Sequence, residues 1–288
     1  MQRSFTAACI GSVAGFAGAL TGMGGAFVAI PLLSAQLGLS QRIAQGTSMA
    51  SVLATATGGA TSFGLSMTSQ SAPSATPPSQ LSSSRFIGNI HIPTAIGVSL
   101  ASSLTALLGA KFSKKLSNKQ LKVSLGMLMI LMSPSPFLRD SLQRMGDGKD
   151  STERREIDEQ GTWIDEMLKS AGIGTVSGFQ AGLFGVGGGA VVVPALCLFT
   201  PLSYPEALGT SLAIMLPTAI SGSYQHYIQG TMAKQIAIPL GIGCLVGSFI
   251  GGKVVGHITD DRPLKTGFSC LMASLGLRTL YTAIKHLR

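Results

Sequence analysis

Two glycine-rich stretches hold the residues whose types and spacing could do chemistry in this chain. They contain Gly22, Gly24 and Gly25 in the first half and Gly185, Gly187, Gly188 and Gly189 in the second. Each stretch interrupts a long uncharged run, where a glycine costs a helix about 1 kcal/mol relative to alanine. We therefore expect one helix to end and another to begin at each stretch. A helix N-terminus offers unpaired backbone N–H groups and a positive dipole end, which together suit an anion.

Two hydroxyl pairs at corresponding places are candidates for additional donors to a bound anion. Thr47 and Ser48 follow the first glycine stretch, and Thr210 and Ser211 follow the second. A hydroxyl can donate to an anion without the cost of burying a lysine or an arginine. The alternative role for these four residues is helix N-capping.

Apart from charges at helix ends, His226 is the one ionisable residue next to an apolar helix. Histidine titrates near neutral pH, so His226 is a candidate carrier of a coupling proton. The alternative is a position at the helix end, in the headgroup region. The cysteines, Cys9, Cys197, Cys244 and Cys270, lack the spacing of metal ligands, so we expect no metal site.

The two glycine-rich stretches belong to an internal duplication. Residues 15–31 match residues 178–194 at a constant offset of 163 residues, and the match continues without a gap to Gly59 and Gly222. A single helix over residues 5–37 would reach roughly 50 Å, well beyond the ~30 Å hydrocarbon core of a bilayer, so a break is needed. Paired breaks in two repeats are the usual sequence pointer to the substrate site of a transporter.

Charged residues are scarce and unevenly spread. Only 11% of the chain is charged, and uncharged runs separate Arg3 from Arg42, Arg42 from Arg85, and Lys169 from Glu206. Runs of this length exceed the ~20 residues that a spanning helix needs. We therefore predict an all-α, multi-pass membrane bundle, in a membrane that the sequence does not identify.

The net charge of +9 is concentrated in loops, most densely between Lys111 and Lys122. Basic residues beside spanning helices favour contact with anionic lipid headgroups. No aromatic interleaving or basic helix face accompanies them, so we expect no nucleic-acid partner. The predicted partners are a small anionic substrate and the lipid bilayer, and a homo-oligomer is compatible with the sequence.

The duplication divides the chain into two four-element halves. Residues 1–138 form the first membrane repeat, with a disordered Ser/Pro-rich loop over residues 66–84. Residues 139–166 form a charged linker, and residues 167–288 form the second repeat. The halves are inverted if the broken segments re-enter the same face of the membrane, and parallel if those segments span it. Charge counts in the loops do not decide between these arrangements.

At these residues the chain resembles the sulfite exporter TauE/SafE family of membrane permeases. The resemblance depends on the doubled Gly-x-Gly-Gly element, on the two Ala-x-Gly-Thr-Ser motifs that follow it at Ala44 and Ala207, and on the glycine ladder of the third helix. It covers nearly all of the chain outside the two linkers. The resemblance implies transport of a small anion, such as sulfite or a sulfonate, and no enzyme activity.

Three alternatives to a permease remain open. A gated anion channel or a non-transporting membrane sensor would have the same helices. The third is a dinucleotide-binding oxidoreductase, because Gly185-x-Gly-x-x-Ala is a weak dinucleotide fingerprint. Such a fold needs a strand before the glycines and an acidic residue about twenty positions later. Glu206 has that spacing, but the surrounding run is too long and glycine-rich for a strand, and the first copy has no acid at the corresponding place.

Overall fold

The computed structural model describes residues 2–65, 86–87, 90–134, 137, 163–200, 202, 204–258 and 261–285. In this part of the chain the elements are α1 (Gln2–Thr21), α2 (Ala26–Gln36), α3 (Gln41–Leu65), β1 (Phe86–Ile87), β2 (Ile90–His91), α4 (Ile92–Ser113), α5 (Asn118–Met132), α8 (Trp163–Phe184), α9 (Gly189–Phe199), α10 (Tyr204–Ile228), α11 (Lys234–His257) and α12 (Asp261–Lys285). The predicted loop over residues 66–84 lies outside the described residues. So does most of the predicted linker over residues 139–166, although α8 begins within it.

The described chain is a bundle of long helices, with one departure from the all-α prediction. Strands β1 and β2 form a short antiparallel pair, in which Phe86 lies opposite His91. This pair directly precedes α4, whose first turn contains Pro93. Two-residue strands carry too little periodicity to be read from sequence.

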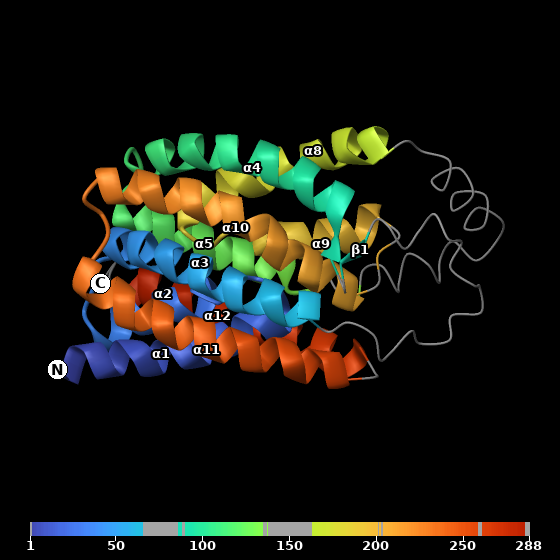
Figure 1. The fold of residues 1–288 in the computed structure, drawn as a ribbon. Helices are drawn as coiled ribbons and strands as arrows, with labels where there is room; N and C mark the ends of the chain where they lie inside the picture. Colours follow the sequence, from blue (N-terminus) through green and yellow to red (C-terminus); the bar gives the residue numbers. More distant parts are fainter. Residues whose placement is uncertain are drawn as a thin grey trace.

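Two helix pairs form opposite edges of the bundle, with α3 and α10 between them (Figure 1). Helix α1 packs along α11, and α4 packs along α8. Both contacts depend on glycine. A Cβ on Gly15 of α1 would lie 2.7 Å from Cα of Cys244, and a Cβ on Gly174 of α8 would lie 3.0 Å from Cα of Val98. Small residues allow the helix backbones to approach this closely, as in other membrane bundles.

Contacts along α3 and α11 show that these helices run in the same direction. Gly46, near the start of α3, packs on Thr231 just before α11, and Gly58 packs on Ser248 farther along α11. Helix α1 runs in the same direction as α11, because Gly243 packs on Ala8 and Gly251 packs on Phe16. These three helices therefore form one parallel set.

Helices α4, α8 and α10 form a second set that runs in the opposite direction. Along α3 and α10 the order is reversed, since Met49 contacts Gly222 and Leu212 contacts Gly59. Helices α3 and α10 occupy corresponding places in the two sequence repeats, as do α1 and α8. Their antiparallel directions match the inverted arrangement, which was one of the two alternatives left open by the sequence.

The outer faces of the bundle are apolar. On α4, Leu100, Leu104 and Leu108 are 60%, 70% and 59% exposed and follow one another at a spacing of four residues, which places them on one helix face. Helices α1, α4 and α11 are long and apolar enough to cross a membrane. Continuous apolar surface on helices of this length is suited to contact with lipid rather than water.

Candidate functional site

The first glycine-rich stretch forms a turn between α1 and α2. Helix α1 ends at Thr21 and α2 begins at Ala26. In between, Gly22, Gly24 and Gly25 have φ angles of 66°, 76° and 71°, a region that side chains other than glycine rarely adopt. The backbone N–H of Met23 donates to the carbonyl of Gly18 at 3.1 Å and closes the end of α1.

The second stretch forms an equivalent turn between α8 and α9. Gly185, Gly187 and Gly188 have φ angles of 67°, 79° and 85°. The N–H of Gly185 donates to the carbonyl of Ala181 at 2.8 Å, and Gly189 is the first residue of α9. We call residues 22–25 the first turn and residues 185–188 the second turn.

The two turns touch each other in the centre of the bundle. A Cβ on Gly189 would lie 2.6 Å from the carbonyl oxygen of Gly22 and 2.7 Å from Cα of Met23. The predicted glycines therefore come together, although the two turns lie more than 150 positions apart in the chain. Each short helix turns back beside the long helix that precedes it, as the packing of Gly25 on the backbone of Ala14 shows.

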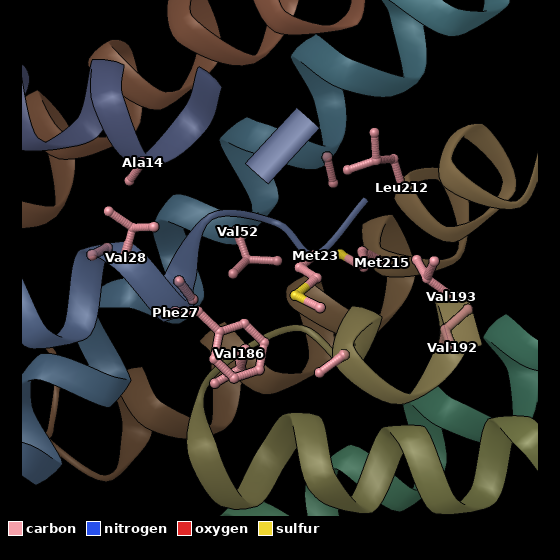
Figure 2. Close-up of a cluster of buried hydrophobic side chains, with 14 of the residues drawn as sticks. Ala14, Met23, Phe27, Val28, Val52, Val186, Val192, Val193, Leu212 and Met215 are labelled. Atoms are coloured by element: carbon pink, nitrogen blue, oxygen red, sulfur yellow. The ribbon is translucent and has the colours of Figure 1, made fainter. Parts of the chain in front are cut away.

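Val52 of α3 and Met215 of α10 fill the space beside both turns (Figure 2). A Cβ on Gly24 would lie 3.0 Å from Cγ1 of Val52 and 3.0 Å from Sδ of Met215, and Gly187 packs against the same two side chains. Val52 and Met215 are themselves 163 residues apart. Sequence analysis missed them, although that offset was a signal that could have found them.

Helices α2 and α9 both begin at this centre without a side-chain cap. The hydrogen-bonding ladder of α2 starts where the N–H of Val28 donates to Gly25 O at 3.0 Å, and that of α9 starts where the N–H of Val191 donates to Gly188 O at 3.0 Å. The cap residues Gly25 and Gly188 have no side chain to bond to the preceding N–H groups. The first N–H groups of both helices therefore have no partner within their own helix.

Ser48 and Ser211 reach the turns, but their hydroxyl groups already have acceptors. Ser48 Oγ donates toward Gly185 O at 2.9 Å and toward Gln45 O at 2.8 Å, and Ser211 Oγ donates to Gly22 O at 2.8 Å. Each serine therefore holds the turn that belongs to the other sequence repeat. Because both serines lie within their helices, neither is an N-cap.

The hydroxyl groups of Thr47 and Thr210 bond to the starts of other helices. Thr47 Oγ1 accepts from the N–H of Ala233 at 3.0 Å, and Thr210 Oγ1 accepts from the N–H of His91 at 2.9 Å. Ala233 and His91 are the N-cap residues of α11 and α4. Each threonine therefore bonds to a different part of the bundle from the serine that follows it in sequence.

His226 is buried in the last turn of α10, about three helical turns from Met215. Its Nδ1 is 2.9 Å from Thr231 Oγ1, and the N–H of Thr231 donates to the His226 carbonyl at 3.1 Å. The residue is therefore at a helix end, as the alternative interpretation expected.

The buried side chains of the described residues are polar in places but uncharged. Among these residues, no group of three or more His, Cys, Asp or Glu side chains could hold a metal ion. The buried polar side chains of the described chain are serine, threonine, glutamine and histidine, without a buried lysine, arginine or carboxylate among them.

Comparison with known proteins shows which membrane proteins this chain is similar to. Residues 2–135 match the family model described as "Sulfite exporter TauE/SafE". The "Probable membrane transporter protein YunE" of Bacillus subtilis is 28% identical over 267 residues, which are 89% of each chain. A "Probable membrane transporter protein" of Xylella fastidiosa strain Temecula1 is 25% identical over 259 residues, 88% of this chain and 85% of the relative.

A third relative is more similar over a shorter part of the chain. The "Probable membrane transporter protein YdhB" of Bacillus subtilis is 38% identical over 106 residues, 36% of this chain and 43% of the relative. No solved structure matches the chain. With its apolar helices and these relatives, this chain is an integral membrane protein and a membrane transporter, and its residues 2–135 are similar to the sulfite exporter TauE/SafE family.

Proposed function

We propose that this transporter moves a small anion, sulfur-containing in the manner of sulfite or a sulfonate, and binds it between the two glycine turns. The observation that carries the proposal is the meeting of two uncapped helix N-termini in the centre of the bundle. Each helix N-terminus is equivalent to roughly half a positive charge, so the pair offers about one charge to an anion. Such a site needs no buried lysine or arginine.

The bare backbone at the turns also favours a small solute. Glycine leaves the main-chain N–H groups accessible, while the neighbouring side chains of Val52 and Met215 are apolar. An apolar surrounding strengthens the interaction between a dipole and an ion, because the local dielectric constant is lower than that of water. In the described conformation Val52 and Met215 occupy the space beside the glycines, so we expect them to move when the anion enters.

The opposite directions of α3 and α10 support transport by alternating access. Inverted halves are common in secondary transporters, where rocking of one half against the other opens the central site to each side in turn. The reciprocal bonds from Ser48 to Gly185 and from Ser211 to Gly22 link each turn to the opposite half. Movement of one half would therefore also move the glycine turn that belongs to the other half.

Uptake into vesicles tests this proposal. The purified protein is reconstituted and offered labelled sulfite, sulfate, thiosulfate and taurine. Gly24→Leu and Gly187→Leu are expected to abolish uptake of the transported anion, because a side chain at either position meets Val52 and Met215. The matched control is Gly267→Leu, an exposed position of α12 with open space around it.

The outcomes separate the proposal from a general loss of folding. Both glycine variants must insert and purify as the wild-type protein does, and Gly267→Leu must keep wild-type uptake. Wild-type uptake rates in Gly24→Leu and Gly187→Leu would show that the turns do not bind the transported solute.

A further inference from the structure

Gln45 of α3 carries a buried amide that no described residue satisfies. Its side chain is 1% exposed, and neither Oε1 nor Nε2 has a hydrogen-bond partner among the described residues. Buried polar groups in proteins are nearly always paired, because an unpaired one destabilises the fold. A buried glutamine with both amide atoms free therefore needs a reason outside the folded chain itself.

The face of α3 that carries Gln45 is directed at the second turn. Gln45, Ser48 and Val52 follow one another at spacings of three and four residues, which places them on one side of the helix. Ser48 bonds to the carbonyl of Gly185, and Val52 packs on Gly187. The Cα of Gln45 lies 3.1 Å from the position that a Cβ on Gly185 would take. The backbone of Gln45 thus lies next to the end of α8, and its buried side chain starts from there.

The corresponding place beside the first turn is apolar. The residue 163 positions after Gln45 is Leu208, and its Cδ2 would lie 2.7 Å from a Cβ on Gly22. Leucine therefore supports the first turn in the place where glutamine stands beside the second. Since the same kind of turn forms with leucine, the amide of Gln45 is not needed to build it.

A second buried amide also has an apolar residue at the corresponding place in the other repeat. Gln180 of α8 is 6% exposed, and both of its amide atoms also have no partner among the described residues. The residue at the corresponding place in α1 is Ala17. Both extra amides therefore belong to the helices that meet at the second turn, and both are replaced by apolar residues at the first.

The backbone of the second turn adds a donor beside Gln45. In the first turn, the N–H of Met23 donates to Gly18 O. The residue that corresponds to Met23 is Val186, and its N–H donates to no acceptor among the described residues. An unpaired amide N–H and an unpaired glutamine NH₂ near the same turn form a pair of donors for an oxygen-rich anion.

We propose that the two turns are unequal and that Gln45 is an anion-binding residue, whose Nε2 donates to an oxygen of a small oxyanion held at the second turn. This inference rests on the proposed function, which supplies the reason for binding an anion. It adds the residue that binds the anion, Gln45, and the turn at which the anion is held. Leu208, at the corresponding place, makes no such bond.

The test compares anion affinity with stability in one set of variants. Gln45→Leu installs the residue found at the corresponding place beside the first turn. In the absence of anion, we expect its melting temperature to equal or exceed that of the wild-type protein, because an unpaired buried amide has been removed. Sulfite, sulfate, thiosulfate and taurine are then added in detergent, and the anion concentration that gives half of the maximal rise in melting temperature is measured. This half-stabilising concentration should be about 10- to 100-fold higher for Gln45→Leu than for the wild-type protein.

The control is Gln235→Leu, the same chemical change at an exposed position of α11. It should keep the wild-type half-stabilising concentration. Gln45→Met, which keeps an unbranched side chain of similar length, replaces Gln45→Leu if the leucine variant yields too little folded protein. If Gln45→Leu and Gln45→Met lower the melting temperature but leave the anion affinity unchanged, Gln45 has a structural role alone and the inference is overturned.

Uptake assays on the same variants separate this inference from the proposed function. Anion-dependent stabilisation that is lost in Gln45→Leu, without uptake by the wild-type protein, would support the binding role and overturn transport. Uptake with the same half-saturating concentration in the wild-type protein and in Gln45→Leu would support transport and overturn the role of Gln45. Neither stabilisation nor uptake with any of the four anions would overturn both.

Discussion

The hydroxyl of Ser48 donates to the carbonyl of Gly185 at 2.9 Å, across the boundary between the two sequence repeats. Ser211 makes the reciprocal bond to Gly22 at 2.8 Å. Because each turn ends a helix and leaves carbonyl groups without partners inside that helix, these serines satisfy acceptors that would otherwise be buried and unpaired. The two halves are therefore joined by hydrogen bonds at the place where their helices are interrupted.

We expect Ser48→Ala to lower the free energy of unfolding by about 1–3 kcal/mol, because it leaves the Gly185 carbonyl buried without a donor. Thermal unfolding in detergent measures the effect. Ser211→Ala should show a loss of similar size, and Ser274→Ala, an exposed serine of α12, should show none. Equal melting temperatures for Ser48→Ala and Ser274→Ala would mean that the bond across the repeats contributes nothing to stability.

Met215→Ala should raise uptake of the transported anion at concentrations below saturation, since Met215 occupies space beside Gly24 and Gly187. The same change removes buried methylene groups and should cost about 2–5 kcal/mol of stability. Initial uptake rates per folded protein, with folding followed by size-exclusion chromatography, test this prediction. A rate per folded protein below that of the wild type would show that Met215 assists the anion rather than blocking it.

Gly178→Ala should destabilise the contact between α8 and α4. A Cβ at this position meets the backbone of Ser102 and lies on top of Thr105 Oγ1, so the helices must separate at a cost of about 1–3 kcal/mol. Gly172→Ala, on the same helix with open space around it, is the matched control. Alanine is the better helix former there, so that variant should be up to about 1 kcal/mol more stable. Equal effects of the two changes on thermal unfolding would contradict close packing of α8 on α4.

His226→Phe tests whether this residue, a candidate from the sequence, carries a coupling proton. Phenylalanine is the residue at the corresponding place in the first repeat, Phe63, which is also buried, so the fold should tolerate it. If His226 carries the coupling proton, the variant loses uptake driven by a proton gradient and keeps exchange of anion across vesicles without a gradient. Thr231→Val, which removes the hydrogen bond to Nδ1, serves as a milder change at the same place. Unaltered gradient-driven uptake in His226→Phe would exclude His226 as the proton carrier.

The amino-acid sequence alone determined the features that depend on local composition. The uncharged runs predicted membrane helices, and the motifs predicted a resemblance to the sulfite exporter TauE/SafE family, which the match over residues 2–135 confirms. The ends of α1 and α8 lie at glycines because a run of glycines is costly in a helix and can adopt positive φ at little cost. These properties belong to a few neighbouring residues, so they can be read along the chain.

Only the tertiary structure decided the directions of the helices and the partners of the polar side chains. Thr47 and Ser48 are adjacent, yet Thr47 accepts from Ala233 while Ser48 donates to Gly185. Adjacent residues of a helix point about 100° apart, so each meets a different helix, and which helix that is depends on packing between distant parts of the chain. The same reason applies to Gln45 and Leu208, which the sequence places at corresponding positions of the two repeats. Only the structure shows that Gln45 is buried with an unpaired amide, whereas the side chain of Leu208 packs on Gly22.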